Sequence, residues 1–271
     1  MLYPHIFQPG RIGKLTLKNR IKFASTTTGF CSEGGIVSPQ EIAFLAERAQ
    51  GGAALVTCGG AHVTPWGPSF PRFAGLWDDK HVPGFTKMVN AIHSGGAKAC
   101  CQLIHCGRYA HAPGESTGPS AVQPRVRRYQ MPRALSLGEI QEVVHAHGQA
   151  ARRAKESGFD VIEINSLAGY LVASFLAPWT NHRTDNYGGP LENRARLLLE
   201  VIAEIKKQVG ADFPLLVRMN SEEQMDGGNT LDDLKQIAQM VEGAGVNGLS
   251  VSVGWHESSL PSITWEVPPG H

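Results

Sequence analysis

Short apolar runs alternate with longer amphipathic segments along the chain. Several of these runs are almost continuously apolar, as expected for strands that are buried on both faces. Such alternation predicts parallel strands joined by helical crossovers. The predicted strands are Ile21–Ala24, Ala54–Cys58, Ala99–Ile104, Val161–Asn165, Leu215–Met219 and Gly248–Val253.

Helix-start signals introduce several of the amphipathic segments. Ser38 is a cap residue, Pro39 suits the first helical position, and Glu41 stands where a capping box places a glutamate. Ser136 and Glu139 repeat this box. The predicted helices are Pro39–Gln50, Phe85–His93, Leu137–Ser157, Leu191–Val209 and Leu231–Ala244.

Six such strands fit either an open doubly wound sheet or an incomplete eight-stranded barrel. No G-x-G-x-x-G motif opens the first helix, which weakens the dinucleotide-binding alternative. Unusual polar and glycine residues follow the strands, and function gathered at strand C-terminal ends is typical of a barrel. We therefore expect an α/β fold, a TIM (β/α)8 barrel that occupies residues 1–271 as one domain and stops after strand six. The segments that follow strands are Ser25–Thr28, Gly59–Gly60, His105–Arg108, Ser166–Tyr170 and Trp255–His256.

Composition and charge argue against several classes of protein. The 271 residues are 42% hydrophobic and 18% charged, which suits a large globular core. A formal net charge of +1 gives no electrostatic case for a nucleic-acid or membrane partner, and no apolar run is long enough to span a bilayer. The cysteines form no CxxC pair and have no regular spacing, so we expect no metal site and a reducing, cytoplasmic location. They are Cys31, Cys58, Cys100, Cys101 and Cys106.

Two polar side chains stand inside predicted strands. Gln102 can present both a donor and an acceptor to a planar heterocycle, or it can be an interior polar residue with a structural hydrogen bond. Arg218 carries a charge that needs a partner if it is buried, either an electron-rich part of a cofactor or a structural carboxylate. The residues alone leave both choices open.

Two further candidates follow predicted strands. Tyr170 comes after Gly169 and can point its hydroxyl into a site as a proton donor, although packing at the barrel rim is the commoner role. His256 is a candidate acid, base or hydrogen-bond donor, although a lone histidine is more often structural. We expect the polar loop Asn181–Arg194 to be mainly architectural.

Taken together, these segments resemble the old yellow enzyme family of NADH:flavin oxidoreductases in order and spacing, from Pro4 to His271. The segment Gly254–Glu257, followed by Leu260–Ile263, is similar to the 2,4-dienoyl-CoA reductase branch. The resemblance implies a barrel with FMN at the strand C-terminal ends and an N-terminal β-hairpin, within residues 7–20, beneath it. The motifs that carry it are Leu17–Ile21, Gln102–Arg108, Gly169–Leu171 and Asn181–Gly189.

The same resemblance implies the contacts to FMN. Gln102 would hydrogen-bond the edge of the isoalloxazine ring, and Arg218 would stabilise the negative charge of the reduced flavin. Hydroxyl and backbone contacts would come from Ser25, Thr26, Thr27 and Gly60.

The resemblance also implies a reaction. Tyr170 matches the family's proton donor, and His256 matches the histidine that supports the substrate or a proton relay in the dienoyl-CoA branch. The implied activity is NAD(P)H-dependent, FMN-dependent reduction of an activated C=C bond, with protonation by Tyr170. Three positions depart from known members: Asn165 and Ala168 replace a carbonyl clamp, and Trp179 replaces an arginine near the substrate. These departures favour a bulky substrate such as an acyl-CoA thioester.

We expect the chain to be the N-terminal portion of a longer protein, whose remainder would add a 4Fe–4S cluster, FAD and NAD(P)H binding. Three alternatives stay open. The first is another reaction on this scaffold, such as amine demethylation or steroid or aryl-CoA reduction, and the second is a non-catalytic, truncated barrel. The third, a flavin-free aldolase-like barrel, is disfavoured because no lysine stands at a predicted strand C-terminal end. The oligomeric state is also open.

Overall fold

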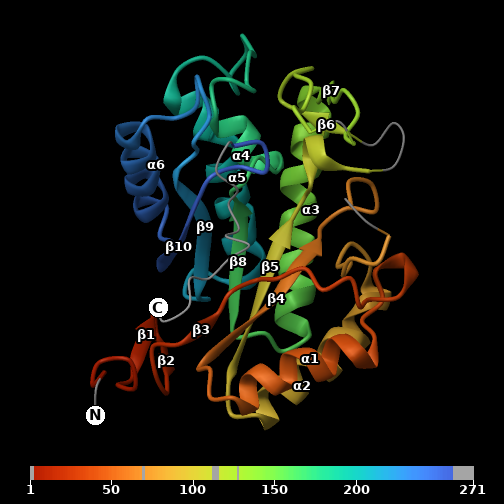
Figure 1. The fold of residues 1–271 in the computed structure, drawn as a ribbon, viewed down its shortest axis with the longest axis vertical. Helices are drawn as coiled ribbons and strands as arrows, with labels where there is room; N and C mark the ends of the chain where they lie inside the picture. The colour runs from red at the N-terminus through yellow and green to blue at the C-terminus, as the bar shows by residue number, and fades with distance from the viewer. Residues whose placement is uncertain (1–2, 69–70, 112–115, 127, 259–271) are drawn as a thin grey trace, which may run out of the picture.

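A computed structural model describes residues 3–68, 71–111, 116–126 and 128–258. Its main sheet has six parallel strands in the order β10-β9-β8-β5-β4-β3 (Figure 1). Chain order and spatial order therefore agree, whereas a doubly wound sheet reverses its order near the middle. The order is that of a TIM barrel. The strands are β3 (Lys22–Phe23), β4 (Leu55–His62), β5 (Lys98–Ile104), β8 (Val161–Ser166), β9 (Leu215–Glu222) and β10 (Gly248–Val253).

The sheet is curled, because side chains from its two edge strands meet on the concave face. Lys22 Nζ on β3 lies 3.5 Å from Ser250 Oγ on β10. The same Nζ lies 2.8 Å from Glu163 Oε2 on β8. Neighbouring strands of a flat sheet are about 4.8 Å apart, so side chains of the two edge strands of a flat six-stranded sheet could not meet.

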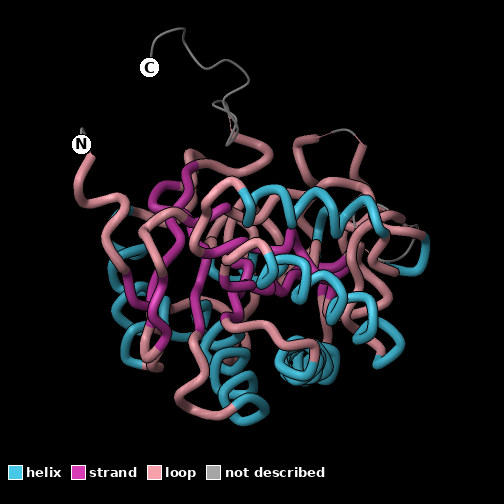
Figure 2. The backbone as a smooth tube through the Cα atoms, turned by 90° about the horizontal axis from the view of Figure 1, so that it is seen from below, coloured by secondary structure: helices cyan, strands magenta, loops and turns pink. Residues whose placement is uncertain are grey.

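Helices form a layer on the outer side of the strands, and neighbouring helices pack side by side (Figure 2). The sequence starts them as expected, since Ser38 Oγ accepts from the Glu41 backbone N–H over 3.2 Å. Apolar side chains such as Phe85 and Ile202 fill the space between helices and sheet. The helices of this layer are α1 (Pro39–Gln50), α2 (Val82–Ser94), α3 (Leu137–Glu156), α5 (Leu191–Val209) and α6 (Leu231–Gly243).

An antiparallel hairpin closes the N-terminal end of the curled sheet. Its strands are β1 (Gly10–Ile12) and β2 (Leu15–Leu17). Leu17 is buried with Leu55 and Val161, which stand at the starts of β4 and β8. The hairpin expected from the family resemblance is therefore present beneath the strands. The remaining short elements are η1 (Glu33–Gly35), η2 (Asp79–His81), η3 (Gly107–Tyr109), β6 (Thr117–Gly118), β7 (Arg133–Ala134) and α4 (Leu171–Leu176).

Three predicted strands and one predicted helix have bounds that are wrong by two residues or more in total. The strand β9 runs on to Glu222, where Met219 was the expected end, and α2 begins at Val82 instead of Phe85. Of the predicted strand 21–24, only Lys22–Phe23 pairs with β4. Shortly after it, the backbone oxygen of Ser25 accepts from the side chain of Arg218 instead of from a neighbouring strand. The segment Gly59–Gly60 was expected after the second strand but lies inside β4. Pairing with β5 resumes at Ala61 after a register shift, so the glycines form an irregularity within the strand.

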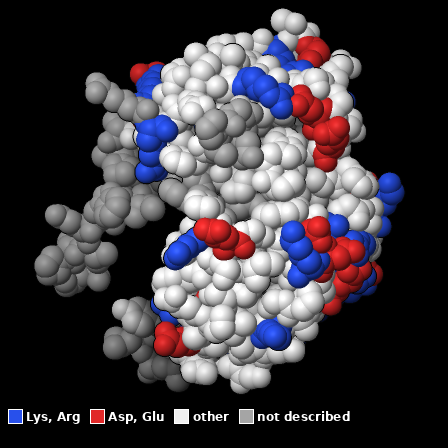
Figure 3. Space-filling view, turned by 90° about the vertical axis from the view of Figure 1, so that its right-hand side faces the viewer, with Lys and Arg blue, Asp and Glu red and all other residues white. Residues whose placement is uncertain are grey.

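The strand β10 differs from the others in its exposure. Its side chains alternate between half-buried and exposed, and the exposed ones are apolar: Leu249 is 42% and Val251 is 61% exposed. Among the described residues, no strand pairs with the free edge of β10. Elsewhere the surface mixes the two charge signs, and blue and red side chains lie beside one another in Figure 3. No helix within the described ranges is long and apolar enough to cross a membrane.

Candidate active site

A cavity of about 490 Å³ lies at the C-terminal ends of the strands. All eight residues predicted for the site line it: Ser25, Thr26, Thr27, Gly60, Gln102, Tyr170, Arg218 and His256. They come from β3, β4, β5, β8, β9 and β10 or from the segments directly after them. The other lining residues are Ala24, Phe73, Ile104, Arg128, Tyr129, Asn165, Leu167, Ala168 and Ser252.

Gln102 is the centre of a hydrogen-bond network on the strands. Its Nε2 donates to Glu163 Oε1 over 2.8 Å. Its Oε1 accepts from Ser25 Oγ over 2.9 Å and from Asn165 Nδ2 over 3.1 Å. The buried Glu163 carboxylate is paired with Lys22 and can only accept a hydrogen bond. The nitrogen of the Gln102 side-chain amide must therefore point toward Glu163, and the amide oxygen toward Ser25 and Asn165. The second Nε2 proton is then the group that Gln102 offers to a bound molecule.

The segment after β3 is tied to β4. Ser25 Oγ accepts from the Gly60 backbone N–H over 3.3 Å. At Gly59 a Cβ atom would lie 2.0 Å from Thr26 O, so only glycine lets these two backbones approach so closely. The Ser25–Thr27 backbone is thereby held at the wall of the cavity.

Arg218 projects from β9 into the cavity and is half-buried. Its Nη1 donates to Ser25 O over 3.0 Å. The sequence left open whether the charge of Arg218 faces a cofactor or a structural carboxylate. Within the described ranges, no carboxylate lies within ion-pair distance of Arg218. A guanidinium has five N–H donors, so further donors stay available for an electron-rich group in the cavity.

Tyr170 and His256 also line the cavity and contact one another. Tyr170 directly precedes α4, and His256 follows β10. Their ring centroids are 5.1 Å apart with an interplanar angle of 81°. Gly169 has φ 88°, and a Cβ atom there would lie 2.4 Å from Trp255 Cε3, so the turn that delivers Tyr170 requires glycine.

The surrounding protein desolvates both side chains, although Tyr170 is half-buried and His256 keeps an exposed surface. Desolvation raises the pKa of Tyr170, so the phenol keeps its proton at neutral pH and can donate it. Desolvation, helped by the positive charge of Arg128, lowers the pKa of His256, while Glu257 opposes this shift. The shift favours the neutral imidazole, which has one nitrogen as donor and one as acceptor.

Three lining residues come from connections in which the sequence indicated no site residue. Phe73 lies in the connection between β4 and η2, and Arg128 and Tyr129 lie between β6 and β7. Arg128 Nη2 donates to Tyr129 Oη over 3.0 Å. These connections carry no periodic pattern, so nothing in the sequence marked them as cavity walls.

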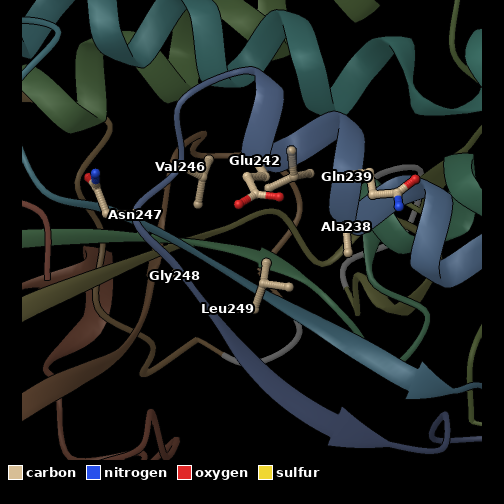
Figure 4. Close-up of a pocket in the computed structure, with 8 residues that line it drawn as sticks. Ala238, Gln239, Glu242, Val246, Asn247, Gly248 and Leu249 are labelled. Carbon is tan, nitrogen blue, oxygen red and sulfur yellow. The ribbon is translucent and has the colours of Figure 1, made fainter.

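A second hollow of about 280 Å³ lies between α6 and the start of β10 (Figure 4). None of the eight predicted residues lines it. Its wall is largely aliphatic, with Glu242 as its single acidic side chain. The lining residues are Ala238, Gln239, Val241, Glu242, Val246, Asn247, Gly248 and Leu249.

Residues 5–264 match the NADH:flavin oxidoreductase / NADH oxidase family. The chain belongs to this family. An NADH oxidase of Thermoanaerobacter brockii is 41% identical over 266 residues, which cover 96% of this chain and 41% of that protein.

Two solved structures extend the comparison. A 2-naphthoyl-CoA reductase in complex with 2-naphthoyl-CoA gives a TM-score of 0.95 at 39% identity, and the match covers 99% of this chain and 43% of that one. An old yellow enzyme homologue from Zymomonas mobilis gives 0.85 at 28% identity and covers 95% of this chain and 77% of that one. The chain thus spans about two fifths of the first two relatives, at 41% and 43% of their lengths.

These matches confirm the predicted family and the TIM-barrel fold. The second part of the branch motif, Leu260–Ile263, lies outside the described residues. Among the residues that are described, no group of three or more His, Cys, Asp or Glu side chains is arranged to hold a metal ion.

FMN is the cofactor implied for an NADH:flavin oxidoreductase, and the residues present fit its flavin part. The cavity volume of about 490 Å³ lies within the usual range for cofactor sites, roughly 300–1,000 Å³. Gln102 and Arg218 supply donors of the kind that flavin oxygens and ring nitrogens accept. Gly60 lines the cavity without a side chain, so its backbone is open to a bound group.

Proposed function

We propose that this chain carries the flavin site of an NAD(P)H-dependent ene-reductase that acts on an activated C=C bond. The observation that carries the proposal is that the Tyr170–His256 pair lines the same cavity as Gln102 and Arg218. In this proposal Gln102 and Arg218 hold the flavin edge, with Ser25–Thr27 and Gly60 along the wall. Tyr170 is the catalytic acid.

When bound, FMN would supply a hydride to one carbon of the C=C bond. The task of Tyr170 is to deliver the proton from its Oη to the other carbon. Its raised pKa suits this task, because the phenol stays protonated until a carbanion-like centre develops beside it. Neutral His256 can donate a hydrogen bond to the substrate or accept one from Tyr170, and so helps to orient the reacting groups.

The proposed substrate class is an enoyl-, dienoyl- or aryl-CoA thioester. Ala168 lines the cavity with a methyl group, and Asn165 is engaged with Gln102, so neither is placed as a strong clamp for a small enone. A large substrate can be held by contacts away from the reacting bond instead. The likeness to a reductase solved with 2-naphthoyl-CoA supports the same class.

The test is a visible spectrum of the purified protein, before and after anaerobic titration with NADH and NADPH. The proposal expects a flavin band near about 450 nm that bleaches on reduction. The bleached protein is then mixed with an enoyl-CoA, a dienoyl-CoA, an aryl-CoA and a small cyclic enone, and the products are identified by mass. Return of the band should be fastest with a CoA thioester.

Two results would contradict the proposal in different ways. A protein that stays colourless with added FMN would remove the cofactor assignment. A yellow protein that is reoxidised only by the small enone, or by none of the alkenes, would keep the cofactor and remove the substrate class.

A further inference from the structure

Tyr109 lies behind the cavity and contacts three of the rings that line it. Its ring centroid is 5.8 Å from that of Tyr170, 5.2 Å from that of His256 and 4.9 Å from that of Tyr129. Tyr109 is fully buried in η3 and does not line the cavity itself. It is therefore a shared support for side chains that come from three different connections.

The hydroxyl of Tyr109 is fixed by Glu257, the residue after His256. Tyr109 Oη donates to Glu257 Oε1 over 2.6 Å. The same oxygen lies 2.9 Å from Arg108 Nη1, and Glu257 Oε2 accepts from the Arg125 backbone N–H over 2.5 Å. The side chain of Glu257 is fully buried, so solvent does not compete for these bonds.

Glu257 thus joins three segments of the chain at one carboxylate: the η3 turn after β5, the connection between β6 and β7, and the turn after β10. Each of these segments supplies a residue at or beside the cavity. The segment that carries Tyr170 is fitted against the same point, because a Cβ atom on Gly169 would lie 2.4 Å from Tyr109 Oη. A shift of the Tyr109 hydroxyl would therefore allow Gly169, and Tyr170 next to it, to move.

We propose that Tyr109 and Glu257 are positioning residues, which hold the rings of Tyr170 and His256 in the arrangement needed for proton delivery. This inference rests on the proposed function, in which Tyr170 Oη donates the proton. The Tyr109–Glu257 bond acts on the reaction only through the two rings. Loss of the bond lets the Tyr109 ring move and removes the edge-to-face contacts that orient Tyr170 and His256. A displacement of about 1 Å at a reacting group can cost about a hundredfold in rate.

The decisive variant is Tyr109→Phe, which keeps the ring and removes only the hydroxyl. Its matched control is Tyr187→Phe, because the Tyr187 hydroxyl also donates to a glutamate, Glu200, over 2.8 Å, but at a site between helices α3 and α5. Both variants lose a tyrosine–carboxylate bond, so a purely structural role predicts similar behaviour. We expect Tyr109→Phe alone to lower kcat for alkene reduction by about ten- to a hundredfold, with the Kd for FMN and the rate of flavin reduction by NAD(P)H unchanged.

A spectroscopic readout keeps the inference separate from the activity. The chain has five tyrosines, so 3-fluorotyrosine labelling gives a small set of 19F resonances, and Tyr170→Phe assigns that of Tyr170. Tyr109→Phe should shift or broaden the Tyr170 resonance in the FMN-loaded protein, and Tyr187→Phe should leave it unchanged. An unchanged Tyr170 resonance in Tyr109→Phe overturns the inference.

The variant Glu257→Gln completes the test, because it removes the shared carboxylate while keeping its shape. If the two residues act through one bond, Tyr109→Phe combined with Glu257→Gln should lower kcat no more than the stronger single change. Additive losses would mean that they act separately and would overturn the coupling. If the unmodified protein reduces no alkene, the proposed function fails, and the 19F shift alone still decides whether Tyr109 holds Tyr170.

Discussion

Two groups of residues that line the cavity are built in different ways. In the first group, side chains on strands or directly after one bond to one another: Gln102 links Ser25, Asn165 and Glu163, and Arg218 bonds the backbone at Ser25. We call this group the floor. In the second group, Tyr170 and His256 stand on turns after strands and contact one another edge to face. We call this pair the rim.

The difference between floor and rim fits two tasks. Hydrogen bonds between strand residues fix distance and direction, so the floor is suited to a cofactor that stays in one place. The rim stands on connecting segments, which commonly carry substrate-binding and catalytic side chains, so it is suited to act on a substrate. Substitutions on the floor should then affect FMN binding, and substitutions on the rim should affect alkene reduction.

The largest effect is expected at the rim. Tyr170→Phe should slow the alkene-dependent reoxidation of reduced FMN by about 10²- to 10⁴-fold, because the proton donor is removed. The Kd for FMN and the rate of flavin reduction by NAD(P)H should stay within experimental error of the unmodified protein. Stopped-flow absorbance measures both half-reactions. Loss of FMN binding in Tyr170→Phe would show that the floor and the rim do not act independently.

The next effect is expected at the floor. Arg218→Met removes the charged donor and should weaken FMN binding by about ten- to a hundredfold, the range expected for one charge-assisted hydrogen bond. Fluorescence titration of the apoprotein with FMN gives the Kd. Arg218→Lys keeps the charge but not the planar guanidinium, so its Kd for FMN should lie between those of the unmodified protein and Arg218→Met. Unchanged FMN affinity in Arg218→Met would remove this residue from the cofactor site.

A smaller effect, on stability, is expected from the turn that carries Tyr170. Gly169→Ala must accept φ 88° and place its Cβ 2.4 Å from Trp255 Cε3. Gly189→Ala is the matched control, because Gly189 has φ 80° with no atom within 4 Å of its added Cβ. We expect Gly169→Ala to lower the free energy of unfolding by about 1–3 kcal/mol more than the control, as measured in urea. Equal losses would show that the clash is relieved by a small movement of Trp255.

The smallest effect is expected from pH. Desolvation and Arg128 lower the pKa of His256, with Glu257 opposing, so its titration midpoint should lie below pH 6.5, where an ordinary histidine is half charged. We therefore expect the rate of alkene-dependent reoxidation, measured from about pH 5 to 8, to show no midpoint at or above 6.5 that belongs to this histidine. A midpoint at or above 6.5 that disappears in His256→Asn would show that its pKa is not lowered.

The sequence predicted the regular elements well where local signals are strong. The helices α1 and α5 and the strand β10 have the predicted bounds, since a capped start, a glycine after the helix or a bounded apolar run marks them. The extension of β4 was missed because a Gly–Gly pair is typical of a turn, whereas here Gly59 lies against the Thr26 backbone and pairing with β5 resumes at Ala61. The helix α4 is too short for its periodicity to be recognised.

The site was predicted from the family resemblance more than from chemistry. Taken alone, Gln102 and Arg218 had two equally good explanations, and only the fold shows that both side chains line one cavity. The Tyr109–Glu257 bond joins residues 148 positions apart, and nothing local to either residue marks it. Contacts of this kind depend on the whole fold and are invisible to any pattern within a short window.

The apolar side of β10 has a practical consequence for anyone who handles this chain by itself. Leu249, Val251 and Val253 expose hydrocarbon along a strand whose outer edge has no partner among the described residues. Such an edge can template pairing with another molecule, and its hydrocarbon adds an attraction that grows with concentration and with temperature near ambient. Concentrated, warm or high-salt solutions should turn cloudy first, and a mild detergent or a charge placed at Val251 should keep them clear.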